Sequence, residues 1–222
     1  METSVGLPNI SQKILLSCGI IAPLIYLGMD WLAGKLLKGY SFAAQSMSEL
    51  SATGAPTRPL VVALTLVASV LMIAFGVGLW HTAGQQLFPR IVSGLIIGNA
   101  AAGLIATSFF PNRYGERPIF GSPGVIIMFL SVLFFVLAMV FGAVAFKGWI
   151  RILSIAIPVA YILLAVLRFA TASASSSGQA VSSIGAQERT MAYSFLLWVT
   201  ALAIYLLMMV SKGVDSAGSV GG

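Results

Sequence analysis

The feature that most constrains this chain is a series of six apolar stretches, each long enough to cross a lipid bilayer. They cover about residues 14–33, 60–80, 91–110, 124–146, 152–169 and 191–210. The hydrocarbon core of a bilayer takes about 20 apolar helical residues, and a spanning helix satisfies its own backbone hydrogen bonds there. We therefore predict an all-α polytopic membrane helix bundle with six transmembrane helices, in which residues 1–222 form a single integral membrane domain.

The composition agrees with a membrane protein, because 59% of the residues are hydrophobic, 8% are charged, and the mean hydropathy is +1.00. This lies far from the composition of soluble domains. The net charge of +6 comes from Lys and Arg residues scattered at the ends of the spans, where long side chains reach lipid headgroups. No continuous basic face is present, so we expect the lipid bilayer as a partner and no nucleic acid.

A single cysteine and a single histidine limit the chemistry of the chain. Cys18 lies inside the first apolar run, which excludes an intrachain disulfide and a cysteine-based metal site. His81 ends the second span, about 30 Å across the membrane from Ser48 and Ser122. This separation disfavours a Ser-His hydrolase, and we predict neither a metal nor a cofactor.

The polar segment 35–59, KLLKGYSFAAQSMSELSATGAPTRP, separates the first two spans. Read as a helix, Ser41 to Leu50 places apolar residues on one stripe and Gln45, Ser48 and Glu49 on the opposite one. Gly54 is suited to end such a helix, and two prolines precede the second span. We predict an amphipathic interfacial helix between the first and second transmembrane helices.

The remaining segments complete the predicted layout. The first run is longer than a signal sequence and lacks an A-x-A pattern, so we expect an uncleaved span. Residues 171–187 are rich in Ser, Ala and Gly and are predicted to be a mobile linker, and residues 212–222 a disordered tail. Gly94 and Gly98 form a small-xxx-small pair that suits a helix-helix partner.

Six spans place both termini on one side of the membrane. The terminal side holds fewer Lys and Arg residues than the other side, so the positive-inside rule taken alone points to external termini. We nevertheless predict a multi-pass protein of the cell membrane with cytoplasmic termini. The reason is that the cations on the far side are accompanied by carboxylates, in what we expect to be a structured cluster.

Every internal acidic residue falls on the face opposite the termini. A carboxylate inside the bilayer costs about 2.5–3.5 kcal/mol on insertion scales, so Asp30 is expected to face a partner or a water-filled cavity. Arg168 and Arg189 are the candidate partners, and Glu49 is a candidate partner for Arg58. The full set of pocket or ion-pair candidates on this face is Asp30, Tyr40, Gln45, Ser48, Glu49, Arg58, Arg113, Arg168, Glu188 and Arg189.

Three stretches carry a family resemblance: GYSFAAQSMSELSATGAPTR (39–58), FFP (109–111) and ERTMAYSFLLW (188–198). In this order the chain resembles the bacterial and archaeal membrane family called domain of unknown function 998. The resemblance implies a six-span protein of unassigned activity. In that family an acidic residue often follows FP and a histidine often opens the fourth span, whereas this chain has Asn112, Arg113 and the sequence GSPG at 121–124. A mechanism that uses that acid and histidine would not carry over.

Two interpretations of the charged face remain. It either fastens loops to helix ends through ion pairs, or it forms a polar pocket for a small molecule or lipid headgroup in a sensing, binding or transport-accessory role. An alternative activity is a membrane-embedded hydrolase or lipid-modifying enzyme that uses the carboxylates of Asp30 and Glu49 as acid and base. A third class is a structural partner of another membrane protein that docks through the Gly-rich third span.

Overall fold

The computed structural model describes residues 9–114, 121–174 and 183–218, and in these residues it contains six α-helices and one short 3-10 helix. The elements are α1 (Asn9–Leu36), η1 (Met47–Ser51), α2 (Arg58–Thr82), α3 (Leu87–Phe109), α4 (Pro123–Ala145), α5 (Trp149–Ala174) and α6 (Ile184–Gly218). The prediction of an all-helical membrane protein is confirmed. Five helices of the described part are long and apolar enough to cross a membrane: α1, α2, α3, α4 and α6. For α5 the corresponding apolar stretch is shorter, Trp149–Leu164.

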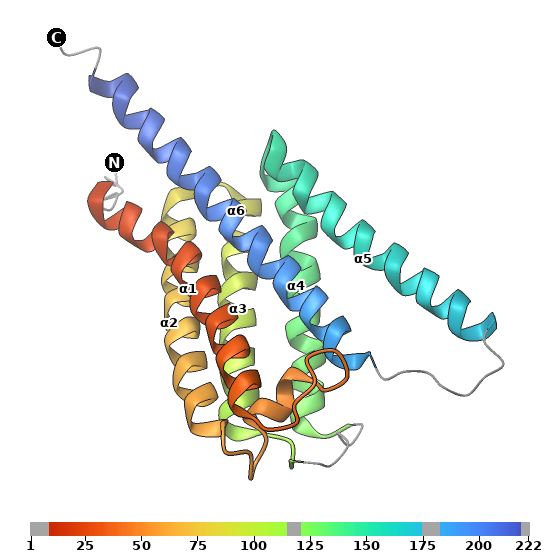
Figure 1. The fold of residues 1–222 in the computed structure, drawn as a ribbon. Coiled ribbons are helices and arrows are strands. Elements are labelled where there is room, and N and C mark those ends of the chain that lie inside the picture. The colour runs from red at the N-terminus through yellow and green to blue at the C-terminus, as the bar shows by residue number, and fades with distance from the viewer. Residues whose placement is uncertain (1–8, 115–120, 175–182, 219–222) are drawn as a thin grey trace.

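Helices α1 to α4 and α6 form the body of the bundle, with α1 against α2 and α6, and α3 between α2 and α4 (Figure 1). The start of α1 and the end of α6 lie at one end, which we call the terminal end. The opposite end holds η1, the loops around it and the start of α6, and we call it the polar end. Helix α5 leans out from the other helices, and its last turns lie away from α4 and α6 (Figure 1).

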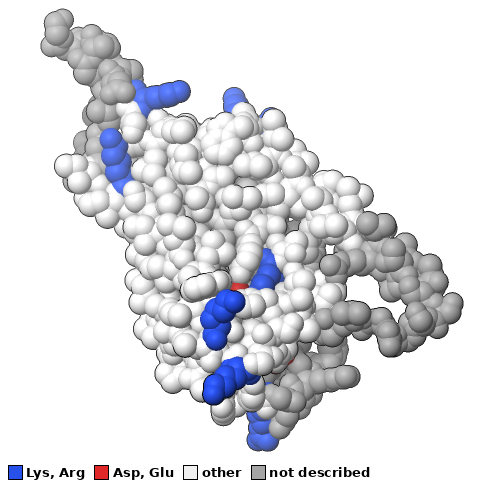
Figure 2. All heavy atoms as spheres, viewed as in Figure 1, with Lys and Arg blue, Asp and Glu red and all other residues white. Residues whose placement is uncertain are grey.

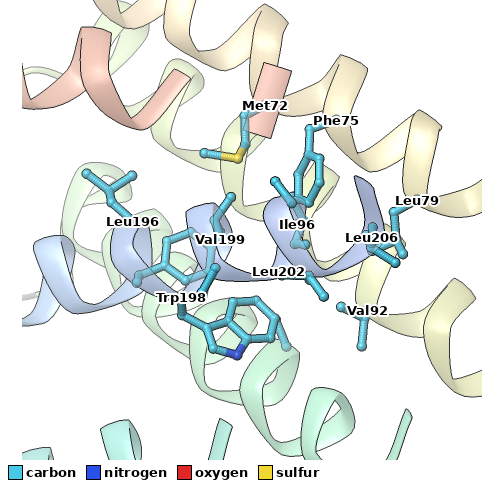
Figure 3. Close-up of a cluster of buried hydrophobic side chains, with 14 of the residues drawn as sticks. Met72, Phe75, Leu79, Val92, Ile96, Leu196, Trp198, Val199, Leu202 and Leu206 are labelled. Carbon is cyan, nitrogen blue, oxygen red and sulfur yellow. The ribbon is translucent and has the colours of Figure 1, made fainter. Parts of the chain in front are cut away.

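The core of the bundle lies where α2, α3 and α6 meet. Phe75 of α2, Ile96 of α3 and Trp198 of α6 are all fully buried, and Figure 3 shows them with the neighbouring aliphatic side chains. Close packing rests on small residues: a Cβ added to Gly19 of α1 would lie 2.6 Å from the ring of Phe75. Van der Waals fit of this kind drives helix association in lipid, where burial of apolar surface adds little.

The surface agrees with a membrane environment. In the view of Figure 2 the Lys and Arg side chains form two groups, one toward each end, and the surface between them carries no visible charge. Large apolar side chains such as Leu24, Val70 and Phe129 are more than half exposed. Exposure of such a surface to water would be unfavourable. The acyl chains of a bilayer, with its headgroups near the two groups of Lys and Arg, would solvate it well.

The predicted amphipathic helix over Ser41 to Leu50 is not observed. Residues 42–45 form turns, and only Met47–Ser51 is helical, as the 3-10 helix η1. The reason is that side chains compete for the backbone: the Gln45 side chain accepts the N–H of Ser41, and the Glu49 carboxylate accepts the N–H of Ser46. Such local bonds replace helical ones.

Several boundaries also differ from the prediction. Helix α5 continues to Ala174 and α6 begins at Ile184, so helical residues occupy both ends of the predicted linker 171–187, while residues 175–182 lie outside the described residues. Helix α6 continues to Gly218, into the predicted disordered tail, and residues 219–222 lie outside the described residues. Hydropathy alone placed the end of this helix at its last apolar residues, but the helical backbone of α6 continues beyond them.

Candidate functional site

The centre of the polar end is an ion pair between α1 and α6. Asp30, in the last two turns of α1, is fully buried, and Arg189, in the second turn of α6, is 7% exposed. The pair is bidentate: Nε of Arg189 donates to Oδ2 of Asp30 and a terminal nitrogen donates to Oδ1, both at 2.8 Å. Two parallel bonds between planar groups are the strongest geometry available to such a pair.

The guanidinium of Arg189 uses all of its donors. Besides Asp30, it donates to the Tyr40 hydroxyl at 2.7 Å, to the carbonyl of Phe42 at 2.7 Å, and to the carbonyls of Gln45 and Gly185 at 3.3 Å. The rings of Tyr40 and Phe42 lie 5.4 and 4.8 Å from its central carbon. We call these residues, together with Asp30 and Tyr193, the Arg189 clamp. It ties the loop 40–45 to two helices.

Asp30 is equally well satisfied. The hydroxyl of Tyr193 donates to its Oδ2, so both carboxylate oxygens accept hydrogen bonds within the protein. A buried carboxylate is tolerated only when its charge and its lone pairs are compensated in this way. Tyr193 was missed by the sequence analysis, although its position four residues after Arg189 places both on one face of a helix.

The first turn of α6 packs directly against the loop 40–45. The N–H of Ala186 donates to the carbonyl of Ala43 at 3.0 Å. A Cβ on Gly185 would clash with the backbone carbonyls of Gln45 and Phe42. Only glycine permits this approach, and a sequence pattern alone does not signal it.

Two carboxylates hold the start of η1. Oε1 of Glu49 accepts the N–H of Ser46 at 3.2 Å, and Oε2 of Glu188 accepts the N–H of Met47 at 2.8 Å. The second oxygen of Glu49 accepts from Nε2 of Gln45 at 2.7 Å. The negative groups therefore converge on consecutive amides at the start of a short helix, where the unpaired N–H groups favour anions.

The serine and asparagine side chains extend this network. The hydroxyls of Ser46 and Ser48 lie 2.8 Å apart, and the side-chain amide of Asn112 donates to Ser48 at 3.3 Å. The backbones of Thr53 and Asn112 are also bonded, at 2.8 Å. The connection that follows α3 is thereby joined to the connection that precedes α2.

The structure brings most of the candidate site residues together and contains the expected ion pair of Asp30 with Arg189, whereas Arg58 and Glu49 have other partners. Arg58 donates to the carbonyls of Ser51, Thr107 and Ser108, at 2.6, 3.4 and 3.2 Å, whereas Glu49 bonds to Gln45 and Ser46. Arg113 is exposed and pairs through its backbone with Thr53. The side chain of Arg168 lies outside the described residues.

Burial alters the titration of Tyr40, which lies in the loop after α1. It raises the pKa of the Tyr40 hydroxyl above its ordinary value, and the hydrogen bond from Arg189 partly offsets this effect. Neutral Tyr40 is therefore the form present at physiological pH, able to accept from Arg189 and donate to the carbonyl of Ser46 at 2.8 Å. Within the described ranges no three His, Cys, Asp or Glu side chains are grouped as a metal site would require.

Comparison with known proteins concerns nearly the whole chain. The family model described as "Protein of unknown function (DUF998)" matches residues 20–205, which confirms the family resemblance and includes every residue of the Arg189 clamp. No curated protein and no solved structure matches the chain.

Proposed function

Because this chain belongs to the DUF998 family, whose function is unknown, we propose a function from its own geometry. It is a six-span protein of the cell membrane with cytoplasmic termini, and its polar end binds a ligand that carries a positively charged amine. Such an amine occurs in zwitterionic lipid headgroups and in small soluble amines. The role is sensing, binding or assistance to transport.

The length of α5 supports the sixth span. Its 26 residues extend about 39 Å at about 1.5 Å per residue, more than the ~30 Å of a hydrocarbon core. Within α5 the sequence contains two charged residues, Arg151 near its start and Arg168 near its end, so the stretch between them is free of charge.

The observation that carries the proposal is the charge of the cluster. Two carboxylates, those of Glu49 and Glu188, lie close enough to interact electrostatically with each other, whereas the charge of Asp30 is balanced by Arg189, whose donors are all in use. Glu49 and Glu188 are half-buried and each accepts a backbone N–H, which leaves further lone pairs on their oxygens. An excess of negative charge at the edge of a low-dielectric region favours a bound cation.

The chemistry of the site selects an amine over other cations. An ammonium group has three donors, and the two carboxylates that hold neighbouring amides have lone pairs left to accept hydrogen bonds from it. At the same end Lys35 and Lys38 are exposed at and just beyond the end of α1, where they suit the phosphate of a zwitterionic headgroup.

The geometry does not favour the alternative of acid-base catalysis by Asp30. Its carboxylate is fully buried, and its oxygens already accept bonds from Arg189 and Tyr193. A general acid or base has to reach the proton that it transfers. Asp30 is therefore a positioning group for Arg189 and the loop.

Native mass spectrometry of the detergent-purified protein tests the proposal. The probes are dioleoyl phosphatidylethanolamine, dioleoyl phosphatidylglycerol and glycerophosphoethanolamine, which separate a lipid amine, a lipid without an amine and a soluble amine. The wild type is expected to retain an amine-bearing probe at least about tenfold better than phosphatidylglycerol, a difference of about 1.4 kcal/mol.

The matched variant is Glu49→Gln with Glu188→Gln. Glutamine keeps an oxygen that accepts the backbone N–H, so thermal stability should change little while the preference for amines is lost. Gln187→Ala, an exposed neighbour, is the control. Equal retention of all probes by the wild type, or an unchanged amine preference in the double variant, would contradict the proposed function.

A further inference from the structure

The terminal end of the bundle is positively charged. Its cations lie at helix ends and in short connections, and they are Lys13, Arg90, Lys147, Arg151 and Lys212. The acidic side chains that the structure describes are Asp30, Glu49 and Glu188, and these belong to the network at the polar end. In the view of Figure 2 no acidic side chain lies among the upper group of cations. Among the described side chains, the cations of the terminal end therefore have no carboxylate partner.

Arg90, in the first turn of α3, is held differently from Arg58 and Arg151. The central carbon of its guanidinium lies 5.0 Å from the centre of the Trp80 ring. Its Nε is buried without a hydrogen-bond partner, and its terminal nitrogens form no bond to any residue that the structure describes. Arg58 and Arg151, by contrast, donate to main-chain carbonyls. Arg90 is thus a charge placed on an aromatic ring with its side-chain donors unused.

An anion outside the protein can compensate this charge. A buried donor without a partner is costly, and native proteins rarely contain one. The side chain of Arg90 is partly exposed and only its Nε is screened, so the terminal nitrogens are accessible from outside. A guanidinium that lies on an aromatic ring presents a planar pair of donors, which matches the oxygens of a phosphate.

The surroundings of Arg90 place it at the level of lipid headgroups. Trp80 lies two residues before the end of α2 and is 44% exposed. Exposed tryptophans at the ends of spans lie at the membrane interface, because an indole has an apolar body and a polar N–H. Leu87 and Phe88, in the same helical turn as Arg90, are 65% and 42% exposed. Acyl chains of a lipid bound here lie along this exposed apolar surface and need no groove in the protein.

We infer that an anionic phospholipid of the leaflet at the terminal end binds this protein, with its phosphate on the guanidinium of Arg90 beside Trp80. This inference is independent of the proposed function, because Glu49 and Glu188 lie at the other end. An anionic lipid is favoured over a zwitterionic one, since the latter brings a further cation to an end that already holds Lys and Arg side chains. A lipid is favoured over soluble phosphate by the exposed apolar surface beside the site.

Quenching of Trp80 fluorescence by dibrominated lipids in vesicles tests the inference. The exposed Trp31 and Trp149 are replaced by Phe, which leaves Trp80 and the fully buried Trp198. Dibrominated phosphatidylglycerol is compared with dibrominated phosphatidylcholine. Phosphatidylglycerol should bind beside Trp80 about fivefold more tightly, which corresponds to the contribution of one cation near an anionic lipid surface. This preference is smaller than the one expected for an amine at the polar end.

The variants separate Arg90 from the general charge of the terminal end. Arg90→Gln should bring the two lipids to within about twofold of each other, because the charge that selects the phosphate is lost. Lys147→Gln removes an exposed cation at the same end and is the matched control, which should keep the preference. Should Arg90→Gln fail to fold, Arg90→Lys should lower the preference by about twofold or more, because an ammonium lacks the planar pair of donors.

Three results would each overturn the inference. The first is equal binding of the two lipids beside Trp80 in the parent protein. The second is an equal loss of preference in Lys147→Gln and Arg90→Gln, which would assign the effect to diffuse surface charge. The third is loss of the preference on addition of soluble glycerophosphoglycerol, which would show that the site takes a soluble phosphate. The proposed function stands in each case, since Glu49 and Glu188 are unchanged throughout.

Discussion

Replacement of Asp30 by asparagine is the sharpest test of the polar end. The substitution keeps the shape of the side chain and removes its charge, which leaves the buried guanidinium of Arg189 without a counter-ion. Removing one partner of a buried pair costs about 3–5 kcal/mol. The upper part of this range is expected, because Asp30 is fully buried and loses a bidentate interaction.

The assay is thermal unfolding in detergent, followed by tryptophan fluorescence, since Trp198 is buried in the core. For a chain of this size about 2–4 °C correspond to each kcal/mol, so a loss of about 4–5 kcal/mol in Asp30→Asn should lower Tm by about 8–20 °C. Lys38→Gln, an exposed cation at the same end, should stay within about 0.5 kcal/mol of the wild type.

A second measurement separates the clamp from general stability. Arg189→Met removes the donors to the loop carbonyls, so amide hydrogen exchange over residues 42–47 should speed up more than exchange in the core of α2. A Tm for Asp30→Asn within about 2–4 °C of wild type, which corresponds to about 1 kcal/mol, together with unchanged exchange over 42–47 in Arg189→Met, would refute the reasoning.

Three further predictions follow from single contacts. Gly185→Ala should destabilise the protein, because its Cβ would displace loop carbonyls, whereas Gly94→Ala, with nothing within 4 Å, should be neutral or stabilise by up to about 1 kcal/mol; paired melting curves check the contrast. Ser154→Ala leaves the buried indole N–H of Trp198 unpaired at a cost of about 1–3 kcal/mol, and hydrogen exchange in α5 should rise while exchange in α2 does not. Burial raises the pKa of Tyr40 above the value near 10 that it has in the unfolded chain. As the pH passes about 10, Tyr40 therefore ionises in the unfolded state first, and the stability of the fold decreases. Tm measured across about pH 9–11 should change less in Tyr40→Phe than in the wild type.

The small-residue pair of α3 shows what a sequence pattern can and cannot predict about helix packing. Gly94 and Gly98 were predicted to admit a helix-helix partner. The ring of Phe134 in α4 would lie 3.0 Å from a Cβ on Gly98, whereas Gly94 has open space. Spacing shows that a helix can approach closely, but the fold decides whether the approaching helix is in the same chain.

The sequence by itself determined the class of this protein. Apolar runs of span length form helices in lipid, because a helix satisfies its own backbone hydrogen bonds. A carboxylate inside a span is costly, so Asp30 was expected to have a partner. The sequence also identified the polar segment 35–59 as a source of candidate site residues. These conclusions depend on solvation energies, which are properties of residue types and of their order in the chain.

Only the tertiary structure decided which partners meet. It placed Arg189 on Asp30 across 159 residues of chain, and it gave the remaining donors of Arg189 to Tyr40, to loop carbonyls and to Gly185. It also replaced the expected amphipathic helix with turns and η1. Periodicity could not show this, because the hydrogen bonds that displaced the helix come from Gln45 and Glu49 locally and from α6 at a distance. The separation of α5 from α6 likewise depends on which helix faces pack together. An apolar face is about as well solvated by lipid as by a neighbouring helix, so side-chain fit between the helices decides the packing, and the sequence pattern does not show that fit.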